Sequence, residues 1–282
     1  MCDQDRFEDD RKLWEARGLI TRTQFGVALG AGVAMMLPQV ANAVTVVESE
    51  LEIKTPDGTA DCYFVHPATG TAPGVLYWPD IFGLRLAART MGKRLAESGY
   101  SVLVVNPFYR KTKGTKGGPS AIAEMMPQMQ ALNETTHMTD AKAFIAWLDT
   151  QASVAKNRKM GTQGYCMGGP MAFRTAAAMP DRVGAVASFH GGGLVGAGAN
   201  SPHLQASKSK ANFLIAIADN DDKSRPTEKD VLKKTFEDAK LSAEIEVYTG
   251  AAHGWCPPDS GVYSEPLAEK AWARLLALYG KL

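Results

Sequence analysis

The chain has 282 residues, of which 45% are hydrophobic and 22% are charged. This composition is ordinary for a globular protein and excludes a collagen-like chain, a disordered chain and a bundle of membrane helices. The 31 basic and 30 acidic side chains leave a formal charge of +1, so the charge balance gives no reason to expect a nucleic-acid partner.

The N-terminal segment has the pattern of an export leader. The apolar run Phe25–Leu37 is too short for a membrane span of about 20 residues, and Ala41-Asn42-Ala43 after it suits cleavage by a signal peptidase. Residues 21–25 (TRTQF) resemble a twin-arginine export motif in which Thr23 replaces the second arginine. We therefore predict a leader at residues 1–43 and an exported, periplasmic protein.

An alternative remains open for the same segment. The stretch before the apolar run holds more acidic than basic residues, whereas leaders are usually basic there. The alternative is a cytoplasmic protein whose N-terminal helix docks on the domain or stays disordered.

Beyond residue 43, strand patterns alternate with helix patterns, which predicts an α/β fold with a mainly parallel sheet covered by helices on both faces. The expected strands, the first two joined as a hairpin by Pro56-Asp57-Gly58, are 44–54, 61–65, 74–78, 101–105, 159–164, 183–189, 213–218 and 243–248. The expected helices are 84–98, 139–150 with Thr139 or Asp140 as its cap, 169–178, 227–240 and 266–280. Without repeats or linkers, residues 44–282 form one domain.

Four cysteines are too few and too scattered for a disulfide framework: Cys2, Cys62, Cys166 and Cys256. No Cys-x-x-Cys pair occurs, so we expect no metal site. A thiol in this chain therefore serves either packing or chemistry.

Residues 164–169 (GYCMGG) are the most informative segment. They fit a Gly-x-nucleophile-x-Gly turn between a strand and a helix, with Cys166 at the position where most hydrolases have serine. Such a turn needs small residues on either side of the nucleophile, and the N-terminus of the following helix favours the thiolate. The alternative is a buried cysteine that only packs between helix and sheet.

Two later segments favour the catalytic interpretation. His253 lies in a loop of small residues after the last expected strand, and an acidic turn (residues 219–222) follows the strand before it. The order nucleophile, acid, histidine is that of α/β-hydrolases. Cys166, Asp221 and His253 are thus a candidate triad, with Asp222 as the alternative acid.

Taken together, these motifs resemble the dienelactone hydrolase (carboxymethylenebutenolidase) family. The resemblance rests on GYCMGG, on residues 78–83 (WPDIFG), on residues 106–110 (NPFYR) and on residues 252–254 (AHG), and it covers about residues 50–280. It implies an α/β-hydrolase fold, a Cys-His-Asp triad, no cofactor, and hydrolysis of small lactones or esters through a thioester acyl-enzyme.

The resemblance also implies roles for further residues. Ile81 and Met167 match the residues whose backbone N–H groups form the oxyanion hole. Asp80 matches an acidic residue, usually Glu, that pairs with the thiol and helps to deprotonate it; Asp is shorter by one methylene group. Tyr109 and Arg110 match the region that contacts the substrate.

One expected substrate contact is missing. Family members that act on dienelactone bind its carboxylate with arginines, one of them four residues after the catalytic histidine, where this chain has Pro257. Arg85 and Arg89 are possible replacements, or else ordinary surface charges. A broad-specificity esterase or thioesterase is therefore the alternative activity, and a non-catalytic ligand-binding relative is a third.

Two residues near these motifs have other interpretations. His190 begins a His-Gly-Gly-Gly segment that resembles a lipase oxyanion loop, but it follows the nucleophile, so we interpret it as a turn at a strand end with a hydrogen-bonded histidine. Cys256 is interpreted as a packed thiol.

Overall fold

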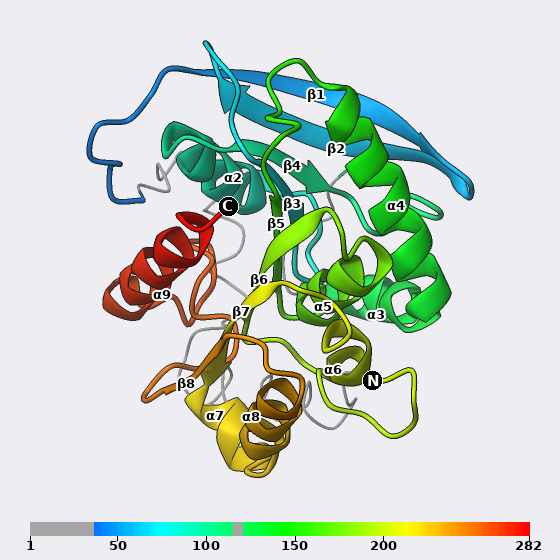
Figure 1. Cartoon of the computed structure of the whole chain (residues 1–282), viewed down its shortest axis with the longest axis vertical. Coiled ribbons are helices and arrows are strands. Elements are labelled where there is room, and N and C mark those ends of the chain that lie inside the picture. The colour runs from blue at the N-terminus through cyan, green and yellow to red at the C-terminus, as the bar shows by residue number, and fades with distance from the viewer. Residues whose placement is uncertain (1–36, 115–120) are drawn as a thin grey trace, which may run out of the picture.

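The computed structural model describes residues 37–114 and 121–282. These residues form an eight-stranded sheet in the order β1-β2-β4-β3-β5-β6-β7-β8 (Figure 1). The strands are β1 (Val46–Thr55), β2 (Gly58–Pro67), β3 (Gly74–Trp78), β4 (Ser101–Val105), β5 (Met160–Tyr165), β6 (Val183–Phe189), β7 (Asn212–Ala218) and β8 (Ala243–Tyr248). The helices are α2 (Leu86–Glu97), α3 (Ile122–Ala131), α4 (Glu134–Thr150), α5 (Gly168–Ala178), α6 (Pro202–Ala206), α7 (Asp219–Ser224), α8 (Glu228–Asp238) and α9 (Glu265–Tyr279).

The sheet is mainly parallel, as the sequence predicted. β1 and β2 form the expected antiparallel hairpin, closed where Thr55 faces Gly58, and β2 pairs antiparallel with β4. Every other strand pair in the sheet is parallel. The carboxyl ends of six parallel strands therefore meet at one edge, which is where parallel sheets place their sites.

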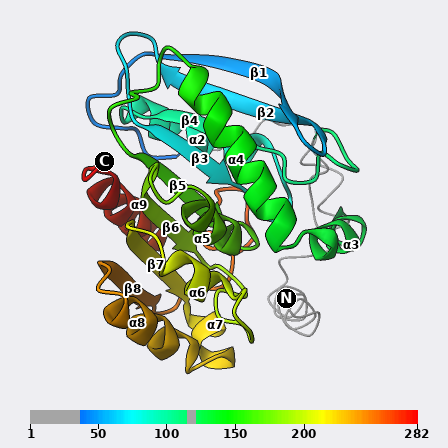
Figure 2. The same ribbon diagram turned by 45° about the vertical axis from the view of Figure 1, so that its right-hand side comes forward.

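Helices cover both faces of the sheet. α2 and α9 lie on one face, where Leu95 and Leu275 are fully buried with the strand residue Val104. α4, α5 and α8 lie on the other face, and the separation of the two layers can be followed in Figures 1 and 2. There the rings of Phe173, Phe213 and Phe236 have centroids 4.4 to 5.9 Å apart. Burial of each such side chain contributes about 1.5–3 kcal/mol to stability, so packing on both faces stabilises the sheet between the two helix layers.

The predicted helix caps and short helices show where the sequence analysis was wrong. α4 begins at Glu134, not at residue 139, because Asn133 accepts hydrogen bonds from the backbone of Thr135 and Thr136 and forms a capping box. Asp140 is instead 2% exposed, inside the helix. α3, α6 and α7 were not predicted; α7 contains the segment that was expected to be an acidic turn.

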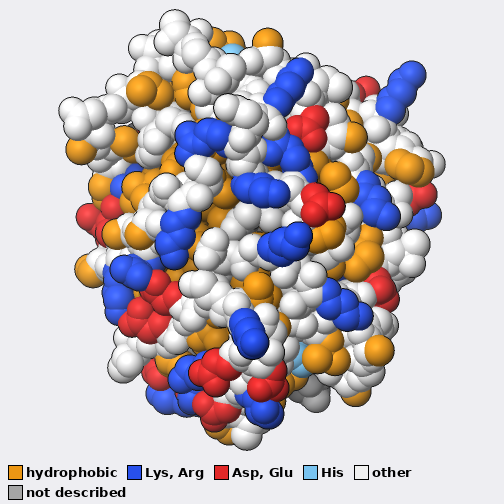
Figure 3. All heavy atoms as spheres, in the orientation of Figure 1, with side chains coloured by type: hydrophobic (Ala, Val, Ile, Leu, Met, Phe, Trp, Pro, Cys, Tyr) orange, Lys and Arg blue, Asp and Glu red, His pale blue; other side chains and the backbone are white. Residues whose placement is uncertain are grey.

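The predicted leader lies mostly outside the described residues. Within the described ranges, residues 39–44 lie against α2 and α9, and the N–H of Val44 donates to the carbonyl of Glu97 at 3.0 Å. No helix in those ranges is long and apolar enough to cross a membrane. On the face shown in Figure 3, basic and acidic side chains are interspersed.

Candidate active site

Cys166 occupies a sharp turn between β5 and α5. Its φ angle is 53°, in the left-handed region that non-glycine residues rarely adopt. Glycine is required around it: a Cβ at Gly164 would lie 1.9 Å from the carbonyl oxygen of Gly168, and a Cβ at Gly168 would lie 2.5 Å from that of Trp78. Strain of this kind, about 1–3 kcal/mol, persists only where packing enforces it, and it is frequent at functional sites.

Aromatic packing beneath the turn holds the backbone of Cys166 in this strained conformation. The ring of Tyr165 is stacked between those of Tyr77 and Phe189, with centroids 5.1 and 4.9 Å away. All three rings are buried. The chain is therefore held in place at Tyr165, directly before Cys166. Cys166 itself is partly exposed at the edge of the sheet.

His253 and Asp221 meet at the same edge. His253 Nδ1 lies 2.8 Å from Asp221 Oδ2, and the backbone N–H of His253 donates to Asn220 Oδ1, also at 2.8 Å. The N–H of Asp219 donates to the carbonyl of Ala251. Three contacts thus attach the histidine loop to the start of α7.

The alternative acid, Asp222, has a different partner. Both of its carboxylate oxygens accept from Lys229 Nζ, at 2.7 and 2.8 Å. Of the two adjacent carboxylates in α7, Asp221 lies against His253, whereas Asp222 pairs with Lys229 of α8.

His190 connects the cysteine turn with His253. Its Nδ1 accepts a hydrogen bond of 3.1 Å from the backbone N–H of Cys166, and its ring lies 4.9 Å from the ring of His253. His190 is 1% exposed, and burial followed by the neighbouring His253 lowers its pKa far below the ordinary value. The ring is therefore neutral and carries its proton on Nε2, which has no hydrogen-bond partner among the described residues. The sequence placed this histidine in the right turn but did not indicate its contact with Cys166.

The backbone N–H groups of Ile81 and Met167, expected to form an oxyanion hole, belong to two segments that meet near the Cys166 turn. Met167 is the N-cap of α5, and Ile81 lies in the loop after β3. Gly168, in the Cys166 turn, closely approaches the start of that loop. Among the residues that the structure describes, neither N–H donates a hydrogen bond. An N–H left without a partner costs free energy unless it has a ligand, so these two donors are candidates for binding a negatively charged oxygen.

Asp80 has both carboxylate oxygens engaged. Arg85 donates to Oδ1 at 2.6 Å and to Oδ2 at 3.0 Å, and the N–H of Phe82 also donates to Oδ1. Arg85 is itself buried, so it is not the solvated surface charge that the sequence left open. Arg89, the other arginine considered, pairs with Glu50.

Tyr109 and Arg110 are engaged in a separate buried network. Tyr109 donates to Asp140 at 2.7 Å and also contacts the hydroxyl of Thr55. Arg110 pairs with Asp140 and with Asp57. Among the described residues, the hydrogen bonds of the two side chains thus lead to α4 and to the β1–β2 hairpin, and the sequence analysis missed Asp140 at their centre.

No group of three or more His, Cys, Asp or Glu side chains that could hold a metal ion occurs in residues 37–114 and 121–282. The other two described cysteines are buried, and burial raises the pKa of both thiols above the ordinary value. Cys166 is thus the described cysteine with a partly exposed position.

The sheet is mainly parallel, a strained nucleophile-type turn follows β5, and an acid in α7 pairs with a histidine in the loop after β8. These features define an α/β-hydrolase. Comparison with known proteins narrows this class. The model of the dienelactone hydrolase family matches residues 60–282, and the chain belongs to that family. It is accordingly a hydrolase that acts on ester bonds, and the predicted fold class and family resemblance are confirmed.

Individual relatives are distant. The chain is 26% identical to the carboxymethylenebutenolidase of Rhodococcus opacus over 231 residues, which cover 80% of this chain and 88% of the relative. A dienelactone hydrolase from Anabaena variabilis has a similar fold, with a TM-score of 0.57, 19% identity, and coverage of 83% of this chain and 96% of that chain. A dienelactone hydrolase-like promiscuous phosphotriesterase from metagenomic libraries gives a TM-score of 0.69 at 18% identity, covering 84% and 98%.

Proposed function

We propose that the protein hydrolyses carboxylic esters or lactones through a thioester acyl-enzyme on Cys166, with His253 as the base and Asp221 as the acid that orients it. The observation that carries this proposal is the 2.8 Å contact between His253 Nδ1 and Asp221 Oδ2, linked through His190 to the strained Cys166 turn. A contact at Nδ1 leaves Nε2 of His253 as the nitrogen that exchanges protons.

In the first step His253 takes the proton of the Cys166 thiol, and the thiolate attacks the carbonyl carbon of the ester. The carbonyl electrons move to oxygen, where the N–H groups of Ile81 and Met167 stabilise the negative charge. When the tetrahedral intermediate collapses, the C–O bond breaks and the proton held by His253 goes to the leaving oxygen. The products are a thioester and an alcohol, or an enol when the substrate is an enol lactone.

In the second step His253 takes a proton from water, and the hydroxide attacks the thioester carbon. The C–S bond breaks, the carboxylic acid is released, and the proton returns to the sulfur. Asp221 stays ionised and holds the imidazole in the required tautomer throughout.

Asp80 was a candidate for a direct role at the thiol. In that role one of its oxygens would have to leave Arg85, since both are bonded to that guanidinium. The proposal therefore assigns proton transfer to His253.

The substrate proposal has a second form, a broad-specificity esterase or thioesterase. Pro257 stands where a carboxylate-binding arginine is expected, and the guanidinium groups of Arg85 and Arg110 are each paired with two carboxylates. An arginine so paired offers little charge to a substrate carboxylate. These contacts favour uncharged esters over dienelactone, whereas the family name favours the lactone. A non-catalytic ligand-binding protein, the third candidate, has no specific contact in its favour.

Export from the cytoplasm remains part of the proposal, on the basis of the leader-like residues 1–43. Comparing the N-terminus of the protein recovered from the periplasm and from the cytoplasm tests it: a periplasmic chain that starts at Val44 is expected, and a cytoplasmic chain that keeps residues 1–43 would contradict it.

The activity test uses the full chain and its Cys166→Ala variant with dienelactone and with p-nitrophenyl acetate. Turnover of dienelactone that is lost in the variant supports the lactonase form, and turnover of the simple ester alone supports the broad-specificity form. Equal rates for both proteins with either substrate would refute Cys166 as the nucleophile. Binding of lactone without turnover would indicate the ligand-binding alternative.

A further inference from the structure

Arg85 makes two bidentate ion pairs at the edge of the candidate site. Nη1 and Nη2 bind the two oxygens of Asp80 at 2.6 and 3.0 Å. Nε and Nη2 bind the two oxygens of Asp259 at 2.6 and 2.9 Å. Arg85 and Asp80 are 8% and 7% exposed, whereas the side chain of Asp259 is 28% exposed, so only the Asp80 end of the cluster is largely removed from water.

The two carboxylates belong to different loops. Asp80 lies in the loop after β3, directly before Ile81, and its Oδ1 also accepts the N–H of Phe82. Asp259 lies between His253 and α9, in a loop closed by a hydrogen bond from the N–H of Ser264 to the carbonyl of Trp255. One guanidinium therefore joins the segment that carries a proposed oxyanion donor to the segment that carries the proposed base.

We infer that Arg85 is a positioning residue, which sets the distance between the Ile81 N–H and His253 by bridging Asp80 and Asp259. The inference rests on the proposed function. A planar guanidinium has donors in fixed directions, so two bidentate pairs fix both the separation and the orientation of the two carboxylates. A lysine ammonium at the same place is a point charge without this geometry.

Arg85 stays positively charged in this bridge. Burial by itself lowers the pKa of Arg85, but the attraction of Asp80 and Asp259 outweighs it, and the pKa lies above the ordinary value of arginine. The bridge therefore acts as a permanent link and not as a proton donor.

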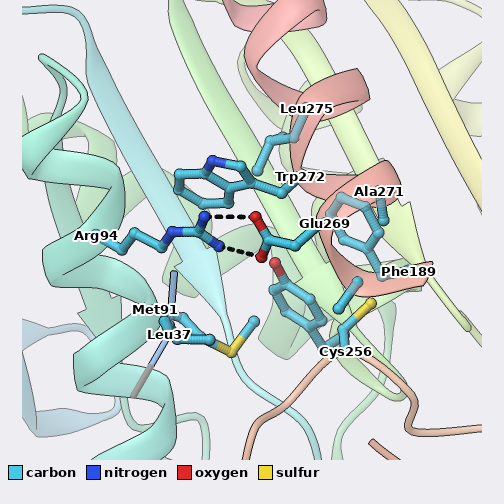
Figure 4. Close-up of a pocket in the computed structure, with 11 residues that line it drawn as sticks. Leu37, Met91, Arg94, Phe189, Cys256, Glu269, Ala271, Trp272 and Leu275 are labelled. Carbon is cyan, nitrogen blue, oxygen red and sulfur yellow. Dashed lines mark hydrogen bonds and ion pairs between the residues drawn. The ribbon is translucent and has the colours of Figure 1, made fainter. Parts of the chain in front are cut away.

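Arg85 is the N-cap of α2, and that helix contains a matched control, Arg94. It is 7% exposed and binds both oxygens of Glu269 at 2.6 Å, with its guanidinium 4.3 Å from the ring centroid of Trp272. Figure 4 shows this pair between α2 and α9. Arg94 thus joins two helices through Glu269. Its substitution therefore measures what breaking a buried bidentate pair does to stability alone.

The test compares Arg85→Lys and Asp259→Asn with Arg94→Lys in the full chain. Steady-state kinetics with p-nitrophenyl acetate, the urea midpoint of unfolding, and the rate at which iodoacetamide alkylates Cys166 are measured for each. Alkylation uses the thiolate but needs no oxyanion hole. Its rate therefore reports the reactivity of the Cys166 thiol and not the position of the Ile81 N–H. Asp259→Asn keeps the Asp80–Arg85 pair and serves as a folded variant in which only one end of the bridge is weakened.

Misplacement of a reacting group by about 1 Å costs about 100-fold in rate, and removal of one oxyanion donor costs about 100- to 1,000-fold. For Arg85→Lys we expect kcat to fall about 10- to 100-fold, with KM and the alkylation rate changed less than about 3-fold. Asp259→Asn is expected to give a smaller fall of the same kind, and Arg94→Lys a lower urea midpoint with kcat unchanged.

Two results would overturn the inference: equal kcat in the Arg85→Lys and Arg94→Lys proteins, or a fall of kcat in Arg85→Lys matched by an equal fall in alkylation. The Cys166→Ala protein, assayed in parallel, separates this from a failure of the proposed function. If Cys166→Ala keeps its turnover, the proposed function is wrong; if it loses turnover while Arg85→Lys behaves like Arg94→Lys, only the positioning role is wrong.

Discussion

Two polar clusters of the molecule differ in how completely their groups are hydrogen-bonded and in how relaxed their backbone is. In the first, which we term the Cys166 cluster (Cys166, His190, Asp221 and His253), the cysteine has a φ of 53° and His190 Nε2 lacks a partner among the described residues. In the second, which we term the Asp140 network (Thr55, Asp57, Tyr109, Arg110 and Asp140), both oxygens of Asp140 are bonded.

This difference separates a site from a structural support. A buried ion pair with complete hydrogen bonding stabilises one arrangement of the elements that it joins, here α4 with the β1–β2 turn. Backbone strain and donors without partners are instead tolerated where a ligand or a reaction compensates for them. The comparison therefore predicts that substitutions in the Cys166 cluster reduce turnover, whereas substitutions in the Asp140 network reduce stability.

Loss of the nucleophile should have the largest effect. We expect Cys166→Ala to lower kcat/KM for p-nitrophenyl acetate by about 10,000-fold or more, since removal of a covalent nucleophile disables the whole triad. The urea midpoint should change little, because the side chain is small and partly exposed. A Cys166→Ala protein with a lowered urea midpoint but unchanged specific activity would reverse the assignment of the two clusters.

Removal of the charge that orients His253 comes next. Asp221→Asn should lower kcat by about 1,000-fold, because an amide presents the wrong partner to Nδ1. Asp222→Asn is the matched control: it changes the neighbouring carboxylate, which pairs with Lys229, and should alter kcat less than about 2-fold. Comparable losses in both variants would contradict the role of Asp221.

The Asp140 network should show the opposite behaviour. The side chain of Asp140 is 3% exposed, and Asp140→Asn leaves Arg110 with a weakened buried partner. We expect a loss of about 3 kcal/mol in the free energy of unfolding, measured with urea, with kcat/KM unchanged in the folded fraction. If kcat/KM falls more than about 10-fold instead, Tyr109 and Arg110 belong to the site after all.

The smallest predicted effect concerns pH. Burial lowers the pKa of His137 to about 3, so the folded protein keeps this ring neutral while the unfolded chain binds a proton near pH 6.5. The stability that His137 contributes is complete above pH 6.5 and is lost as the pH falls toward 3. Relative to a His137→Gln variant, the wild type should lose about 2 kcal/mol between pH 6.5 and pH 5. An identical pH dependence in both proteins would contradict the neutral state of this buried ring.

The sequence was sufficient to predict the features that depend on a local pattern or on the order of residues along the chain. The Gly-x-Cys-x-Gly spacing carries its own steric reason, since a Cβ at Gly164 or Gly168 would collide with backbone. The central strands, such as β3 and β4, were predicted within a few residues because apolar runs that are buried on both faces are distinctive. The positions of Asp221 and His253 followed from chain order, which the α/β topology fixes.

What the sequence could not provide depends on contacts between distant residues. Arg85 and Asp259 are 174 positions apart, and Tyr109 and Asp140 are 31 apart, so no local pattern predicts either pair. The start of α4 was misplaced because Thr139 and Asp140 are also good caps, and only packing shows that Asp140 is buried. α3 was missed because Pro127 lies inside it and no side chain caps it.

The most direct test of the thioester proposal is the intact mass of the protein mixed with p-nitrophenyl acetate and quenched in acid within the first turnovers. The account predicts a gain of one acetyl group, located on Cys166 by peptide mapping, absent from Cys166→Ala and released on further incubation. Turnover without any acyl adduct on Cys166, or an adduct on another residue that decays at the rate of turnover, would contradict it.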